Sequence, residues 1–300
     1  MLKKFIILGM LGLISLVHAK INTVVSILPQ KTFLKAIGGD KVNIALMVKP
    51  GNSPHTYEPK PSQMIDISKA DIYFSIGIQF EEAWLPKFAT QNKNMKIVNI
   101  GKSVKRIAMA EHNHDDEDEH EHHNADHNAD HNEDEHEEHN SLDPHIWTSP
   151  NNVKIIAKNI LTHLVEIDKN NKKYYEKNYD IFINSVNNTN TKIKEILNET
   201  NKGTKFMVFH PAWGYFAKQY SLVQVPIEIE GKKPKPRDII KLIKDAKKQN
   251  IKAILTAPEF SDKLAKQIAK ELNIPIIKIS PLNPKWSNNL INLAKTISNK

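Results

Sequence analysis

The chain has no cysteine and only two arginines. Without cysteine the protein can form neither a structural disulfide nor a thiolate zinc site, and no cysteine is present to carry a lipid anchor. Arg106 and Arg237 are the two arginines among 42 basic residues. Because arginine is the side chain favoured for bidentate phosphate recognition, this lysine-rich composition indicates a solvated surface and no nucleic-acid interface.

Long apolar runs are also absent beyond the N-terminus. There, a short cationic start precedes an apolar run from Phe5 to Val17, and the small residue Ala19 follows. This is the pattern of a cleaved secretory signal peptide, and the run is short for a membrane span, although an uncleaved anchor is the alternative. We therefore expect residues 1–19 to be removed. The mature chain is then expected to be a soluble, unlipidated periplasmic protein with no integral membrane segment.

Histidine and acidic residues are concentrated in one tract. Residues 111–140 contain nine histidines and fourteen carboxylates but no lysine or arginine, which leaves a formal charge of +22 on the rest of the chain. Imidazole suits Zn, Ni, Co and Cu, and carboxylates are harder co-ligands, so the tract indicates metal collection. The alternative is a solvated acidic insert, although such linkers ordinarily use Ser, Pro and Gly. We expect a disordered loop with auxiliary weak metal sites at His112, His114, His120, His122, His123, His127, His131, His136 and His139.

The rest of the sequence alternates β-branched apolar runs with helical patterns. This order predicts an α/β fold with a four-stranded, mainly parallel sheet in each half. The expected strands are Ile21–Leu28, Val42–Val48, Asp71–Gly77 and Ile97–Ile100 in the first half, and Lys205–Phe209, Leu222–Glu228, Lys252–Thr256 and Ile274–Ile279 in the second. The expected helices lie near 30–38, 61–70, 81–90, 213–220, 236–249, 261–273 and 286–298.

Two longer helical patterns separate the halves. One begins after Ser149 and continues to about Glu166, and the next extends from Asn170 to about Thr200 without glycine or proline. A helix of about 30 residues spans about 45 Å, which predicts a rigid backbone helix between two lobes and restrained domain motion. We accordingly divide the mature chain into an N-terminal lobe (20–148, including the tract), a helical linker (149–200) and a C-terminal lobe (201–300).

Three histidines outside the tract occupy positions typical of ligands. His55 lies in the turn after one expected strand, His210 directly follows another, and His145 precedes the helical linker. Ligands bind beyond the carboxyl ends of the strands in open α/β sheets, so a cleft between the lobes could gather all three. A single histidine beside a proline is more often a turn or cap residue. The set is more informative, because only His18 and His163 remain outside the tract, and we expect His163 to be a packing or surface residue.

Three segments carry a family resemblance. PGNSPHTYEPKPSQM, LDPHIWTSP and FHPAWGYFAKQY resemble the signature stretches of the periplasmic zinc-binding component of bacterial ABC importers. That component belongs to a wider family of metal-binding substrate-binding proteins that also serves manganese. IEIEGKKPKPRDI is similar to the EGKxPSP stretch of the family's second lobe. The resemblance implies two four-stranded α/β lobes, a rigid connecting helix and a metal site in the inter-lobe cleft, with His55, His145 and His210 as ligands.

The ligand types favour zinc over manganese. Manganese-type members resemble this chain but carry a Glu near His210 and an Asp after the last strand, where this chain has Ser280. Neutral imidazoles suit tetrahedral zinc, whereas manganese prefers carboxylates. The fourth ligand stays open between Glu58, Glu81, Glu259, a carboxylate of the tract, and water, which we favour. Because a ligating imidazole must be neutral, we expect zinc release as the pH falls below about 6.5.

The function implied by the resemblance is high-affinity capture of Zn²⁺ in the periplasm and delivery to a membrane ABC permease with its cytoplasmic ATPase. We expect a monomer and no enzymatic activity. The alternatives are a periplasmic zinc buffer or metallochaperone without a permease, a manganese-type importer component, and a zinc hydrolase. Three histidines with an open position is also a catalytic layout, but the chain lacks HExxH, GxSxG and Walker motifs.

Overall fold

The computed structural model describes residues 20–109, 142–228, 234–249 and 251–298. The expected signal peptide (1–19) and the histidine-rich tract (111–140), with its nine auxiliary histidines, lie outside the described residues. Among the residues that are described, no helix is both long and apolar enough to cross a membrane.

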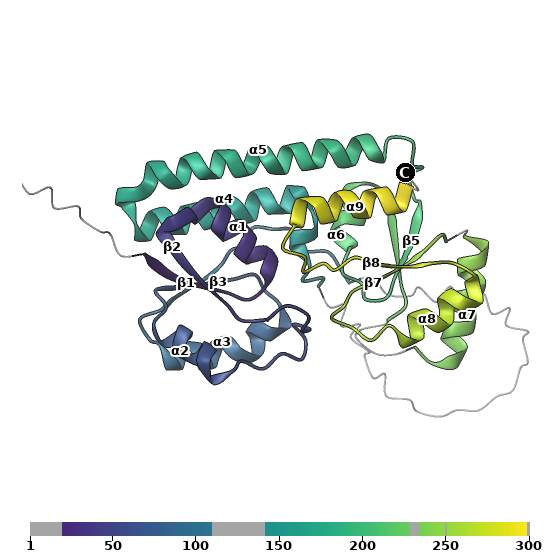
Figure 1. Ribbon diagram of the computed structural model, residues 1–300, viewed down its shortest axis with the longest axis horizontal. Helices are drawn as coiled ribbons and strands as arrows, with labels where there is room; N and C mark the ends of the chain where they lie inside the picture. The colour runs from purple at the N-terminus through teal and green to yellow at the C-terminus, as the bar shows by residue number, and fades with distance from the viewer. Residues whose placement is uncertain (1–19, 110–141, 229–233, 250, 299–300) are drawn as a thin grey trace, which may run out of the picture.

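Each half of the molecule contains a four-stranded parallel sheet, as the sequence predicted (Figure 1). Both sheets have the same order, in which the second strand lies beside the first and the third lies on the other side of the first. The N-terminal sheet has the order β2-β1-β3-β4, with β1 (Ile21–Val25), β2 (Val42–Leu46), β3 (Ile72–Ser75) and β4 (Lys96–Asn99). The C-terminal sheet has the order β6-β5-β7-β8, with β5 (Lys205–Val208), β6 (Val223–Pro226), β7 (Ile254–Thr256) and β8 (Ile276–Lys278).

Helices cover both faces of each sheet (Figure 1). In the N-terminal half α2 and α3 lie on the face opposite α1, and in the C-terminal half α7 and α8 lie on the face opposite α9. Their bounds are α1 (Leu28–Gly38), α2 (Pro61–Ser68), α3 (Gln79–Gln91), α6 (Gly214–Gln219), α7 (Pro236–Lys248), α8 (Lys263–Leu272) and α9 (Trp286–Ser298). All seven helices lie where the apolar periodicity predicted them.

Two long helices join the halves. In α4 (Pro150–Ile167) the Ser149 side chain caps the N-terminus by accepting a hydrogen bond from the Asn152 amide. The following helix α5 (Lys172–Ile196) has 25 residues and is about 37 Å long at 1.5 Å per residue. It packs against α1 and α4 on one side of the molecule and against α9 on the other. The expected long connecting helix is therefore present, and it contacts helices of both halves.

The two halves share one hydrophobic core. Trp147, in the connection between them, donates its indole hydrogen to the Pro281 carbonyl oxygen at 2.8 Å. Trp286, at the start of α9, donates to the Trp147 carbonyl oxygen at 2.7 Å and packs edge-on against Phe33 of α1 at 5.6 Å. A second, smaller core lies under α7 and α8. Because the larger core is continuous, it holds the two halves in a defined relative position. The loops that lie between the halves are positioned in the same way.

We predict that the metal-free protein unfolds in one transition and that Trp286→Ala destabilises the whole protein. Removing a buried tryptophan removes about 3–5 kcal/mol of unfolding free energy, and here the lost contacts belong to both halves. Ile181→Ala on α5 is the control, because Ile181 is 60% exposed. Denaturant titration followed by fluorescence and circular dichroism measures both variants. Two separate transitions, or a loss for Trp286→Ala no larger than for Ile181→Ala, would contradict the shared core.

Candidate metal centre

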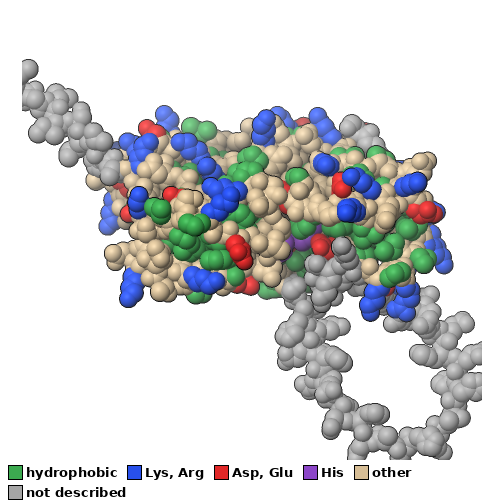
Figure 2. All heavy atoms as spheres, turned by 60° about the horizontal axis from the view of Figure 1, so that its bottom comes forward, with side chains coloured by type: hydrophobic (Ala, Val, Ile, Leu, Met, Phe, Trp, Pro, Cys, Tyr) green, Lys and Arg blue, Asp and Glu red, His purple; other side chains and the backbone are tan. Residues whose placement is uncertain are grey.

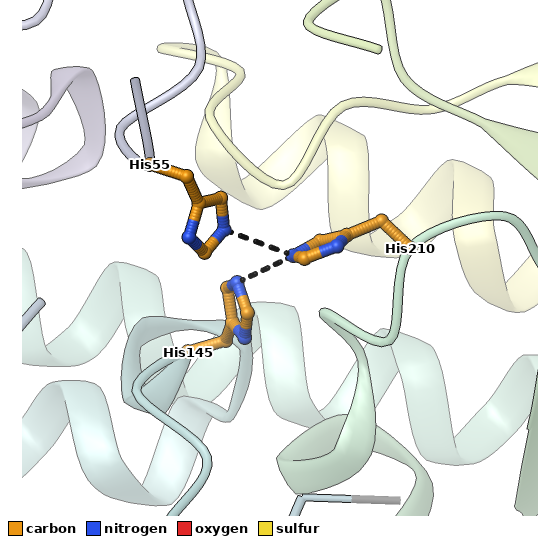
Figure 3. A group of neighbouring side chains, drawn as sticks. All are labelled: His55, His145 and His210. Atoms are coloured by element: carbon orange, nitrogen blue, oxygen red, sulfur yellow. Dashed lines mark hydrogen bonds between the residues drawn. The ribbon is translucent and has the colours of Figure 1, made fainter. Parts of the chain in front are cut away.

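The structure brings together the three histidines that the sequence singled out. His55 lies in the loop after β2, His145 directly precedes the short 3-10 turn Ile146–Thr148, and His210 follows β5. Their rings point toward one centre (Figure 3). The Nε2 atom of His210 lies 3.4 Å from that of His55 and 3.3 Å from that of His145. Among the described residues, these three histidines form a group whose ligand atoms all lie within 4.8 Å of one another.

The opposite nitrogen of each ring is held by an oxygen acceptor. The three pairs are His55 Nδ1 with Gln79 Oε1 at 2.9 Å, His145 Nδ1 with Asp143 Oδ1 at 2.8 Å, and His210 Nδ1 with Glu228 Oε2 at 2.7 Å. An acceptor at Nδ1 places the ring hydrogen there, so a neutral ring keeps its lone pair on Nε2. Three lone pairs therefore face one another without a hydrogen between them. That arrangement is suited to a cation.

Burial keeps two of these rings neutral. His210 is only 8% exposed, and this burial lowers its pKa below the ordinary 6.5, although the hydrogen bond to Glu228 opposes the shift. Burial likewise lowers the pKa of His55 below 6.5, against the opposing hydrogen bond to Gln79. Because only neutral imidazole binds metal, the lowered pKa values favour ligation at neutral pH.

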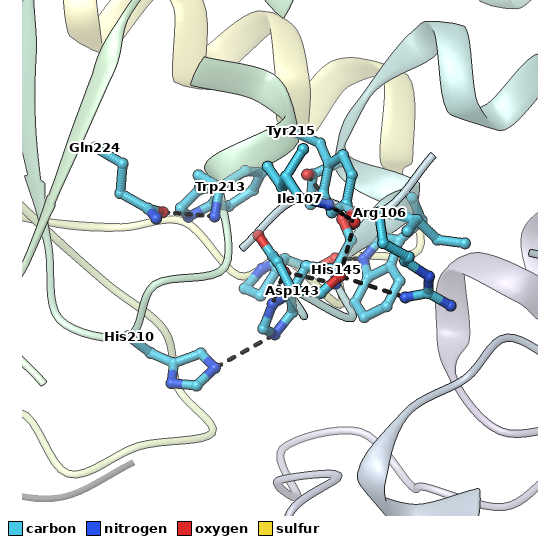
Figure 4. A network of polar contacts seen from close by, with 12 residues as sticks. Arg106, Ile107, Asp143, His145, His210, Trp213, Tyr215 and Gln224 are labelled. Carbon is cyan, nitrogen blue, oxygen red and sulfur yellow. Dashed lines mark hydrogen bonds and ion pairs between the residues drawn. The ribbon is translucent and has the colours of Figure 1, made fainter. Parts of the chain in front are cut away.

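Asp143 is held by both halves of the molecule (Figure 4). Its Oδ1 accepts hydrogen bonds from both the backbone amide and Nδ1 of His145, each at 2.8 Å. Its carbonyl oxygen accepts from the Tyr215 hydroxyl of α6 at 2.8 Å and from Arg106 at 3.3 Å. Arg106 also donates to the Ile76 carbonyl oxygen at 2.8 Å. The position of His145 therefore depends on groups from both halves.

Glu81 and Glu58 do not reach the centre, contrary to two of the options for a fourth ligand. Glu81 is only 2% exposed, and its carboxylate accepts hydrogen bonds from the Ser26 hydroxyl and from the backbone amides of Ile76 and Gly77. Burial raises the pKa of this carboxyl, and these hydrogen bonds oppose the shift. Glu81 thus pairs with backbone amides that directly precede α3. Glu58 is exposed and does not line the pocket that contains the histidines.

Glu259, the third option, does line that pocket. The other walls are largely apolar and include Ile78, Trp147, Phe260 and Leu282. The Phe260 ring stacks on His210 with centroids 4.4 Å apart. In the space-filling view, histidine is visible in the recess at the middle of one face (Figure 2). The pocket therefore opens at the junction of the two halves.

The sequence did not predict the three residues that orient the rings. Asp143 could have been found, because it stands two residues before His145. Glu228 follows β6, which pairs with β5, so its nearness to His210 depends on sheet pairing. No local sequence pattern marked Gln79, at the start of α3, as a partner of His55.

Comparisons with known proteins agree with this architecture. A family model described as "Zinc-uptake complex component A periplasmic" matches residues 23–299. The chain is 32% identical over 260 residues to the high-affinity zinc uptake system protein ZnuA of Bacillus subtilis, covering 84% of this chain and 76% of that protein. It is 29% identical over 267 residues to the manganese ABC transporter substrate-binding lipoprotein scaA of Streptococcus gordonii, covering 86% and 78%.

Solved structures show the same fold. A crystal structure of ZnuA superimposes with a TM-score of 0.81 at 36% identity, covering 94% of this chain and 99% of that one. A ZnuA deletion mutant lacking 138–173, with zinc bound, gives a TM-score of 0.80 at 36% identity, covering 94% and 98%. With the family model matched along almost the whole described chain, this protein belongs to the ZnuA family of substrate-binding proteins of metal ABC transporters.

Proposed function

We propose that this protein captures Zn²⁺ in the periplasm with His55, His145 and His210 and delivers it to an ABC permease served by a cytoplasmic ATPase. The spacing of the three Nε2 atoms carries the proposal. A tetrahedral zinc with Zn–N bonds of about 2.0–2.1 Å holds its ligand atoms about 3.3–3.4 Å apart. The two Nε2 distances are 3.4 and 3.3 Å.

The donor set supports zinc over manganese. Relatives of both kinds exist, since the Bacillus subtilis protein is named for zinc and the Streptococcus gordonii protein for manganese. Manganese prefers carboxylate and higher coordination, whereas three imidazoles suit zinc. Here the described ligand group is all nitrogen. Ser280 stands where the resemblance places a manganese-type Asp, and its hydroxyl donates to Glu259.

The size of the pocket argues against a hydrolase. Its volume is about 20 Å³, which is room for an ion and a water, whereas pockets for organic ligands are about 300–1,000 Å³.

A zinc buffer would use the same three histidines as ligands but would need no membrane partner. Crosslinking to a membrane permease, and zinc-limited growth after deletion of the gene, distinguish transport from buffering.

The proposed location is the periplasm without a lipid anchor, since the chain has no cysteine.

The three histidines, and not the tract, are expected to form the tight site. We predict that His145→Ala or His210→Ala weakens zinc binding by more than the roughly 10–100-fold typical of residues that only orient ligands. A variant without residues 111–140 should keep the tight site. Its ends can be joined, because Ala108 and Leu142 pair in an antiparallel bridge. Competition titration against a chelator measures all three.

His163→Ala is the matched control, because His163 lies on α4, outside the three-histidine group, and is hydrogen-bonded to Glu166. It should bind zinc as the wild type does. Loss of the tight site in the variant that lacks the tract would assign the site to the tract and overturn the proposal.

Zinc affinity should fall as the pH is lowered, because the ligating rings must be neutral. The lowered pKa values of His55 and His210 delay protonation of these two rings to below their ordinary 6.5, and protons then compete with the ion. Equilibrium dialysis of the variant without the tract, between pH 5 and 8, tests this. The absence of any decline down to pH 5 would contradict a three-histidine site.

A further inference from the structure

One residue that lines the pocket has a buried carboxylate oxygen without a hydrogen-bond partner. Four buried side-chain atoms of the described residues lack a hydrogen bond: Asp143 Oδ2, Gln224 Nε2, Thr256 Oγ1 and Glu259 Oε2. Of these residues, Glu259 alone lines the pocket with the three histidines. An unpaired buried charge is costly, and such groups are ordinarily matched by a water, an ion or a ligand.

The rest of the Glu259 carboxylate is fixed. Its Oε1 accepts a hydrogen bond from the Ser280 hydroxyl at 2.6 Å. The Ser280 oxygen itself accepts from the Leu282 amide at 3.0 Å, so its hydroxyl hydrogen is directed to Glu259. Oε1 is therefore occupied, whereas Oε2 has no hydrogen-bond partner among the described residues.

The topology explains why this carboxylate lies beside the histidines. β5 and β7 are parallel neighbours, His210 follows β5, and Glu259 follows β7. In a sheet of this order, ligands bind where the connections diverge, between the carboxyl ends of these two strands. Gln79 follows the corresponding strand β3 of the other sheet and orients His55. Glu259 has no such role, because all three Nδ1 atoms already have acceptors.

Glu259 does not lie at the distance of a direct ligand. A fourth tetrahedral ligand would lie about 3.3 Å from each Nε2, yet Glu259 does not belong to the group whose ligand atoms lie within 4.8 Å of one another. A water bound to the ion bridges the gap, since an O–H···O⁻ bond adds about 2.5–2.7 Å to a zinc–oxygen bond of about 2.0–2.2 Å. The pocket volume of about 20 Å³ exceeds the roughly 10–15 Å³ that one water needs.

We propose that Glu259 completes the metal site by accepting, at Oε2, a hydrogen bond from a water in the fourth coordination position. This inference rests on the proposed function. Three neutral imidazoles leave the charge of a divalent cation uncompensated. Asp143 and Glu228 lie behind the rings, whereas Glu259 is a carboxylate residue of the pocket lining itself.

The test compares Glu259→Gln with Glu58→Gln in the full chain. Each variant removes one negative charge, but Glu58 is exposed and lies outside the pocket lining. Glutamine at 259 keeps an acceptor for Ser280 and presents an amide hydrogen where the carboxylate accepted one. Zinc binding, measured against a chelator that empties the weaker sites, should fall by roughly 10–100-fold for Glu259→Gln. It should stay within about twofold for Glu58→Gln, because an exposed charge is screened.

Two further measurements separate this role from a structural one. Thermal unfolding of metal-free Glu259→Gln should give a melting temperature equal to or above the wild type, because an unpaired buried charge has been removed. A crystal structure of the zinc-loaded wild type should show a water on the ion, hydrogen-bonded to Glu259. The proposal is overturned by equal zinc affinities of the two variants, by a lowered metal-free melting temperature of Glu259→Gln, or by direct contact between Glu259 and zinc.

The outcome also separates this inference from the proposed function. If His145→Ala binds zinc as tightly as the wild type, the three-histidine site itself is wrong. If His145→Ala loses the tight site but Glu259→Gln matches Glu58→Gln, the histidine site stands and only the role of Glu259 fails.

Discussion

The hydrogen bond that each site histidine makes through Nδ1 is the interaction on which the centre depends. With an oxygen acceptor at Nδ1, a neutral ring has its lone pair at Nε2, and the three Nε2 atoms face one another. With the ring hydrogens on Nδ1, no hydrogen lies between the three Nε2 lone pairs. A divalent cation at this position would satisfy all three lone pairs, and the rings are oriented for it in its absence.

This preparation requires the two halves to hold a defined relative position. His55 comes from the N-terminal half and His210 from the C-terminal half, and their Nε2 atoms are 3.4 Å apart. A shift of 1 Å between the halves would change that distance by a large fraction. The shared core around Trp147 and Trp286, with α5 packed along both halves, resists such a shift. The hydrogen bonds from Tyr215 and Arg106 to Asp143 likewise hold His145 in position.

The charges around the site are arranged in layers. Three neutral rings contact the centre, and the carboxylates of Asp143 and Glu228 lie behind two of them. Burial lowers the pKa values of His55 and His210 and so favours their neutral rings, while the carboxylates behind His145 and His210 favour a cation at the centre. In the proposed function, selectivity for zinc depends on the nitrogen donors, and the walls limit the space left for additional ligands.

Local sequence patterns determined much of this protein. Apolar periodicity located all eight strands and the helices between them, because each element depends on residues close in the chain. The three histidines stood out because strand ends and turns place side chains at a sheet edge. The roles of the carboxylates were decided only by the tertiary structure. Glu81 accepts hydrogen bonds from the backbone before its own helix, Glu228 orients His210, and Glu259 lines the pocket. All of them lie near strand ends, and sequence cannot distinguish them because their partners are set by the packing of distant segments. The same packing of the two halves brings His55 next to His210, 155 positions along the chain.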